Sequence, residues 1–97
     1  MEGDLLFHLL TPLQEVASCR CDAVTLFEKD GAQGFGGSIG IRRGHLPAVV
    51  ALAEGGTVKV TAEGRTVFAA TVRGGFARVD HGSVTVLTPE AEVTIEA

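Results

Sequence analysis

The stretch Gly36-Gly37-Ser38-Ile39-Gly40-Ile41-Arg42-Arg43-Gly44-His45-Leu46-Pro47 separates two blocks of strand-like sequence. Its glycines permit positive φ angles or the close approach of another chain. Residues 38–41 still favour a short strand, with Ile39 and Ile41 on one face. The Arg-Arg-Gly-His segment that follows is a basic loop, and polar loops on a rigid scaffold commonly carry function. We therefore expect this loop to contact another protein.

Short strand-like segments extend on both sides of this stretch. Residues 5–11 form an apolar run that ends at Pro12, and residues 15–27 form a second, in which the alternation changes parity. We expect a β-bulge at Asp22-Ala23 to accommodate that change. Further strands are expected downstream at residues 48–53, 57–61, 66–72, 76–79, 83–87 and 92–96, separated by turns at 54–56, 63–64, 73–75 and 80–82. Without sustained helical periodicity, the pattern predicts an all-β sandwich or barrel.

Two of these strands carry a further expectation. The compact apolar segment 48–53 predicts a buried strand, because it lacks polar positions. Residues 92–96 alternate between polar and apolar side chains, which predicts a terminal strand with one face in water.

Composition bounds the class of protein. Ninety-seven residues, 45% of them hydrophobic, are enough for one folded domain. The net charge of −4 and the absence of Trp and Tyr argue against nucleic-acid binding, which needs positive charge and stacking aromatics. No apolar run is long enough to span a membrane, and the acidic start is unlike a signal peptide. We expect a cytosolic protein without direct membrane insertion.

The glycine-rich connection 28–37 contains G-x-x-G and G-x-G-G fragments, so phosphate binding has to be considered. A dinucleotide fingerprint requires a helix after the glycines, and a phosphate loop requires Gly-Lys-Ser/Thr. Here Ile39-Gly40-Ile41 follows and no helix is predicted. Phosphate binding is therefore not expected.

The cysteines and histidines show no arrangement that indicates chemistry. Cys19 and Cys21 are too close for an ordinary disulfide and lack two further ligands for a metal, so we expect two small buried side chains. His8 is interpreted as a packed or edge residue and His81 as a solvated turn residue. No serine lies in a nucleophile elbow, and nothing points to a substrate beside His45. We expect no catalytic residue, metal or cofactor.

Residues 40–47, Gly-Ile-Arg-Arg-Gly-His-Leu-Pro, resemble the Gly-Ile-x-Pro-Gly-His-x-Pro segment of the epsilon subunit of rotary F-type ATP synthases. Three further motifs of that family follow in order at residues 52–60, 74–76 and 84–87. The resemblance covers about residues 5 to 93, nearly the whole chain.

The resemblance implies a ten-stranded β-sandwich, or flattened barrel, like the amino-terminal domain of that subunit, as a single domain over residues 1–97. In the family this domain packs on the gamma subunit and touches the membrane ring of c subunits. The implied function is a non-catalytic central-stalk subunit that couples gamma to the c-ring during ATP synthesis or transport of protons or sodium ions. The resemblance also implies that the chain lies on the cytoplasmic side of the cell membrane, where the complex holds it. No small-molecule substrate is implied.

Three departures from the family pattern matter. The family usually has an acidic or aromatic residue at the position of Ser38 or Ile39, and Ser38 lacks the carboxylate that can face the rotor ring. Arg43, preceded by Arg42, replaces the usual proline. The chain stops at Ala97, so we expect the family's carboxy-terminal helical hairpin to be absent and carry over neither its inhibition nor its ATP binding. The length is similar to the shorter epsilon subunits of alternative, sodium-type ATPases, or to a truncated chain.

The resemblance and the basic loop together define the candidate partner-binding residues. They are Ser38, Gly40, Ile41, Arg42, Arg43, Gly44 and His45, with Arg73 as a further candidate on the gamma-facing side. The alternative is a free-standing β-sandwich that binds a small molecule or peptide in the loop cleft. Formation of a complex with gamma distinguishes the two.

Overall fold

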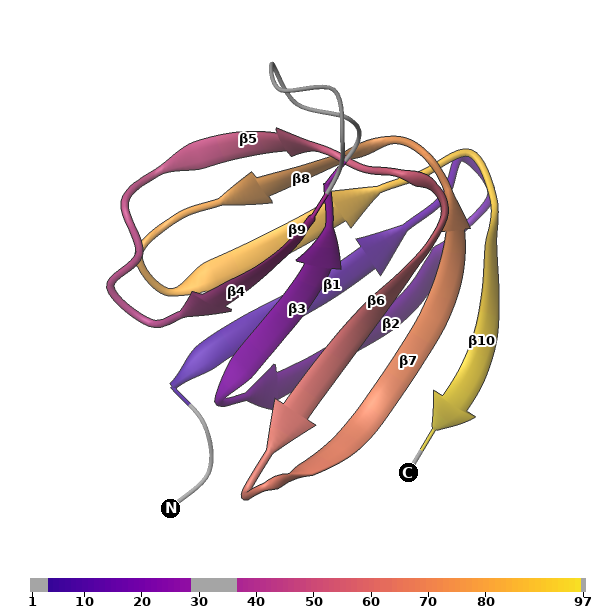
Figure 1. The fold of residues 1–97 in the computed structure, drawn as a ribbon. Coiled ribbons are helices and arrows are strands. Elements are labelled where there is room, and N and C mark those ends of the chain that lie inside the picture. Colours follow the sequence, from indigo (N-terminus) through magenta and orange to yellow (C-terminus); the bar gives the residue numbers. More distant parts are fainter. Residues whose placement is uncertain (1–3, 29–36, 97) are drawn as a thin grey trace.

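The computed structural model describes residues 4–28 and 37–96. In this part of the chain ten strands form and no helix does, which confirms the predicted all-β sandwich (Figure 1). The strands are β1 (Leu5–Leu10), β2 (Glu15–Cys21), β3 (Ala23–Phe27), β4 (Ser38–Arg42), β5 (Ala48–Ala51), β6 (Glu54–Ala62), β7 (Arg65–Arg73), β8 (Phe76–Val79), β9 (Ser83–Leu87) and β10 (Ala91–Glu96).

The strands form two five-stranded sheets that pack face to face. The order is β2-β1-β9-β8-β5 in the first sheet and β10-β7-β6-β3-β4 in the second. β1 and β9 run parallel, and the other strand pairs in the described residues are antiparallel. β4 and β5 are edge strands of different sheets, so the loop between them closes one side of the sandwich.

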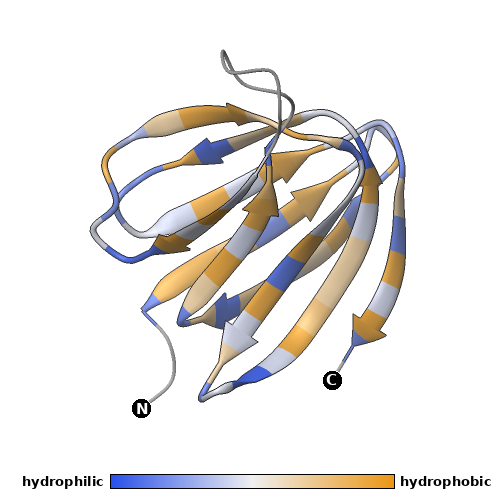
Figure 2. Ribbon diagram, in the orientation of Figure 1, coloured by the Kyte–Doolittle hydropathy of each residue, from blue (hydrophilic) through white to orange (hydrophobic). Residues whose placement is uncertain are grey.

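The core lies between the sheets and follows from alternation along the strands, visible in Figure 2 as alternating colours. Phe7 of β1 and Phe68 of β7 meet across the interface, with ring centroids 5.8 Å apart and planes tilted by 45°. Val58 and Val60 point inward as predicted. The other fully buried large side chains are Leu5, Leu9, Val24, Leu26, Ile41, Val72, Val79, Val84 and Val86.

The prediction of a β-bulge at Asp22-Ala23 is wrong. The chain leaves the first sheet at Cys21 and enters the second at Ala23, so the change of parity marks a crossover between sheets. Asp22 holds this corner: its N–H donates to the carbonyl of Thr61 at 2.8 Å, and its carboxylate accepts the N–H of Glu63 at 2.6 Å.

The turn expected at residues 54–56 is present, because the N–H of Gly56 donates to the carbonyl of Ala53 at 3.1 Å, but it lies within the first residues of a strand. β6 begins at Glu54, and the glycines that follow are absorbed by a register shift between Glu54 and Thr57. Gly55 has φ +79°, the positive value that a bulge of this kind commonly requires. The tight turn predicted at residues 63–64 does form, with positive φ at both Glu63 and Gly64.

Two edge strands, β5 and β10, are more exposed than expected. The segment 48–53 contains β5, an edge strand on which Val49 is 70% exposed, so it is not a buried strand. On β10, Val93 and Ile95 are 38% and 45% exposed, so this strand presents apolar groups to water as well as polar ones. Most of the glycine-rich connection, residues 29–36, lies outside the described residues.

Candidate interaction surface

The basic loop after β4 is a tight turn. The carbonyl of Arg42 accepts a hydrogen bond from the N–H of His45 at 3.2 Å, and Gly44, the third residue of the turn, has φ +88°. These features match a type II turn, which selects glycine at this position. Nδ1 of His45 lies 2.8 Å from the carbonyl oxygen of Leu46, within hydrogen-bonding distance. The predicted loop therefore has a well-defined backbone.

A second turn supports the first. The N–H of Gly44 donates to the carbonyl of His81 at 2.7 Å, which joins the β4–β5 turn to the β8–β9 turn. Both turns lie at the left edge of Figure 1. Arg78 pairs with Asp80 at 3.7 Å beside them, and His81 is exposed as expected. Local sequence patterns carry no signal for this contact, because the two turns are far apart in the chain.

The structure brings most of the predicted loop residues onto one exposed strip. Ser38, Gly40 and Arg42 alternate along the outer face of β4, and all three are exposed, as is Arg43 in the turn. Ile41 needs a correction. Its side chain is 0% exposed and belongs to the core, so it supports the strip from below and is closed to a partner.

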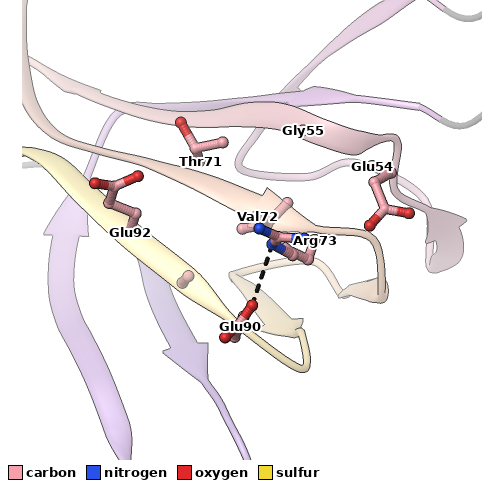
Figure 3. A pocket seen from close by; sticks show the side chains of 8 residues that line it. Glu54, Gly55, Thr71, Val72, Arg73, Glu90 and Glu92 are labelled. Atoms are coloured by element: carbon pink, nitrogen blue, oxygen red, sulfur yellow. Dashed lines mark ion pairs between the residues drawn. The ribbon is translucent and has the colours of Figure 1, made fainter.

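Arg73 lies away from the basic turn. It ends β7 next to the start of β8, whereas the basic turn lies near the other end of β8. Its Nε is 3.1 Å from Oε1 of Glu90, and both side chains are largely exposed. Figure 3 shows this pair at an open cleft of about 440 Å³. The cleft is otherwise lined by Glu54, Gly55, Thr71, Val72, Ala91 and Glu92.

An apolar row crosses the outer face of the first sheet. Leu10, Leu87, Phe76 and Ala51 are cross-strand neighbours on β1, β9, β8 and β5. Phe76 is 56% and Leu87 48% exposed, and both line an apolar groove of about 440 Å³ with the prolines at positions 12 and 89. The sequence pattern did not predict this surface, although the outward parity of Phe76 and Leu87 could have indicated it.

The outer face of the second sheet is different in character. Its outward positions on β3, β6 and β7 include Thr25, Thr57, Lys59 and Thr71. Polar side chains on a solvated sheet face are the usual pattern for a sandwich in water. The second sheet also carries exposed apolar side chains, such as Phe27 on β3 at 41% and Ile95 on β10 at 45%, but these two strands are not neighbours, whereas the row on the first sheet runs across four neighbouring strands. Contiguous apolar surface of this kind commonly marks a binding site.

Two observations on the described residues concern metal binding and cysteine chemistry. Among residues 4–28 and 37–96, no group of three or more His, Cys, Asp or Glu side chains is placed to hold a metal ion. Burial raises the pKa of the Cys21 thiol to about 11, so it is protonated and a poor nucleophile at neutral pH. In the same residues there is no apolar helix of membrane-spanning length.

Comparison with known families identifies the fold. Residues 4–94 match the model of the ATP synthase, Delta/Epsilon chain, beta-sandwich domain. The chain belongs to this family. The resemblance drawn from the four sequence motifs is confirmed, because curated relatives are named ATP synthase epsilon chain.

Two of these epsilon-chain relatives differ in length. The ATP synthase epsilon chain of Frankia casuarinae is 38% identical over 86 residues, which cover 89% of this chain and 93% of the relative. That of Nitratidesulfovibrio vulgaris strain DP4 is 40% identical over 94 residues, or 95% of this chain but only 63% of the relative. The chain thus spans nearly all of one relative and less than two thirds of the other.

Solved structures agree on the fold. A chain in the Euglena gracilis mitochondrial ATP synthase, OSCP/F1/c-ring, superposes with a TM-score of 0.73 at 24% identity, covering 94% of this chain and 54% of that one. A chain of the Tetrahymena thermophila mitochondrial ATP synthase central stalk/c-ring gives a TM-score of 0.64 at 17% identity, covering 93% and 66%. At these identities the similarity establishes the epsilon-type sandwich alone.

The departure from the family proline leads to a stability prediction. Arg43 is the second residue of the turn, where proline is favoured, its φ is not positive, and its N–H makes no backbone hydrogen bond within the described residues. Arg43→Pro should raise the free energy of unfolding by about 0.4–1 kcal/mol, by restricting the unfolded chain. Urea denaturation measures this, with Arg43→Ala as the control, expected within about 0.5 kcal/mol of the parent chain. A lower midpoint for the proline variant would contradict the turn type.

Proposed function

We propose that this chain is a non-catalytic central-stalk subunit of a rotary ATP synthase, which links the gamma subunit to the membrane ring of c subunits. The observation that carries the proposal is the family match over residues 4–94, joined with an epsilon-chain relative covered over 93% of its length. On this proposal the domain is a peripheral part of the complex on the cytoplasmic side of the membrane, and its work is mechanical coupling.

The two surfaces of the sandwich suit two partners. The apolar row, near Arg73, has the character of a permanent subunit contact and is proposed to pack on gamma. The basic turn near the other end of β8 is proposed to face the rotor ring, with Ser38, Gly40, Arg42, Arg43, Gly44 and His45. A subunit that joins two partners needs separate surfaces for them, and the strand length between the row and the turn provides that separation.

The apolar surface is tested by binding to gamma. Wild-type chain should co-elute with purified gamma from the same source in gel filtration. Phe76→Asp places a charge in the middle of the apolar row and should weaken the affinity about thirtyfold, the effect of losing one central contact. Ile95→Asp is the matched control, because Ile95 is similarly exposed, at 45%, but lies on the edge strand of the second sheet.

The possible outcomes test the proposed function and the proposed gamma-binding surface separately. Absence of any complex between wild-type chain and gamma would overturn the proposed function and favour a free-standing binding module. If wild-type chain binds gamma and Phe76→Asp binds equally well, gamma uses another face. Circular dichroism of both variants checks that the sandwich is retained.

A further inference from the structure

The fold of the chain does not explain why residue 40 is a glycine. It lies in the middle of β4, its φ is not positive, and a Cβ added to it would meet no atom within 4 Å. Gly56 is different, because an added Cβ would come within 3.1 Å of Cβ of Phe27. Glycine inside a strand costs about 0.5–1 kcal/mol relative to alanine and often marks the close approach of another backbone. The open space above Gly40 is therefore suited to a partner.

The strip around Gly40 is exposed. Ser38 and Arg42 flank it on the same outer face, and all three positions are exposed. β4 is the edge strand of its sheet, so a segment of another chain can approach from the side as well as from above. The turn beyond Arg42 is held in place by the hydrogen bond from Gly44 to His81. The strip therefore needs little backbone rearrangement to bind.

The charges beside Gly40 indicate what binds. The chain carries 12 acidic and 8 basic residues, yet Arg42 and Arg43 stand together at this turn. Three ion pairs form within the described residues, and neither arginine takes part in them. Two neighbouring carboxylates are engaged elsewhere, Asp80 with Arg78 and Asp22 with the N–H of Glu63. The turn therefore presents two guanidinium groups without a carboxylate partner in that part of the chain.

We propose that this strip binds an acidic, extended segment of a partner protein, with its backbone against Gly40 and its carboxylates on Arg42 and Arg43. Guanidinium groups bind carboxylates through two parallel hydrogen bonds, so arginine suits this recognition better than lysine does. A second copy of the chain fits poorly, because a symmetric contact would bring the same arginines together. The inference rests on the proposed function and adds the chemistry of the surface that faces the turn.

The test uses the complex of gamma with the detergent-solubilised rotor ring as the probe. Arg42→Glu with Arg43→Glu should weaken binding about tenfold or more at about 0.05 M salt, and the difference should shrink at about 0.5 M, because exposed charges are screened. The matched control is Arg20→Glu with Arg65→Glu, which changes the net charge equally at two exposed arginines away from the strip.

A separate series of variants tests the contact at Gly40. Gly40→Ala and Gly40→Val should weaken binding in that order at every salt concentration, since the added atoms occupy the space of the partner backbone. Thermal unfolding of the isolated chain should show equal or higher stability for both variants, because nothing in the chain lies within 4 Å of the new Cβ.

The outcomes distinguish this inference from the proposed function. If wild-type chain binds the probe and both the arginine and the Gly40 variants bind equally well, the inference is overturned and the function stands. If wild-type chain binds neither gamma nor the probe, both are overturned. Vesicles of phosphatidylcholine with phosphatidylglycerol provide a third measurement. If wild-type chain binds them and the arginine variant does not, the ligand is an anionic lipid surface and the acidic segment is overturned.

Discussion

Gly75→Ala is expected to lower the free energy of unfolding by about 3 kcal/mol or more, a large fraction of the roughly 5–15 kcal/mol typical of a domain. Gly75 has φ +104°, a conformation that side chains rarely adopt. An added Cβ would also collide with the carbonyl oxygen of Leu87 and lie 2.8 Å from Cα of Thr88. Both neighbours belong to the backbone, so relief requires the crossover between β7 and β8 to move.

Gly74→Ala is the matched control for this prediction. Gly74 also has a positive φ, +73°, but the nearest atom to an added Cβ is the carbonyl oxygen of Leu52 at 3.9 Å. Its substitution should cost only the conformational term of about 1–2 kcal/mol. Urea denaturation of both variants measures the difference. Equal losses for the two glycines would show that the collision with Leu87 is relieved without cost.

Gly75 also connects the fold to the proposed docking face. Its carbonyl accepts the N–H of Leu52 at 2.9 Å, which joins the crossover to the chain beyond β5. Phe76 follows at once and pairs with Leu87 and Ala51 in the apolar row. The glycine pair is therefore where the chain changes sheets and begins the strand that carries the most exposed member of the row.

Local patterns were sufficient to predict most of the strands. Val58 and Val60 alternate with polar residues, and that alternation alone places them in the core. At Asp22 the same reasoning failed, because a change of parity fits both a bulge within one sheet and a crossover between two. Contacts with distant strands distinguish the two, such as the hydrogen bond from the N–H of Asp22 to Thr61 of β6, and these lie outside any local window.

The candidate site was predictable only in part. Arg42, Arg43 and Gly44 stood out as a basic, glycine-containing loop, and the turn geometry agrees. The contact between Gly44 and His81 and the distance of Arg73 from the turn depend on which strands are neighbours, which spacing along the chain does not determine. Ile41 was assigned to the surface because of its motif, although its parity with Ile39 already pointed inward.

Phe7→Ala is expected to lower the free energy of unfolding by about 3–5 kcal/mol, the usual effect of removing a buried phenylalanine. Phe7 is 0% exposed on β1, and its ring meets that of Phe68 on β7 across the two sheets. The loss combines the burial energy of the ring with a cavity that two hydrogen-bonded sheets cannot easily close. The affected contact joins the two sheets, so unfolding should remain a single cooperative transition with an earlier midpoint.

A double-mutant cycle tests the contact itself. The combined Phe7→Ala and Phe68→Ala chain should be more stable than the sum of the single losses predicts, by about 0.5–1.5 kcal/mol, because the ring pair is removed only once. His8→Ala, one residue along on the outward face, is the control and should cost less than about 1 kcal/mol, since its 3.1 Å contact with Glu15 is solvent-exposed. A loss at His8 equal to that at Phe7 would contradict the inward and outward alternation of β1, on which the placement of the core between the sheets depends.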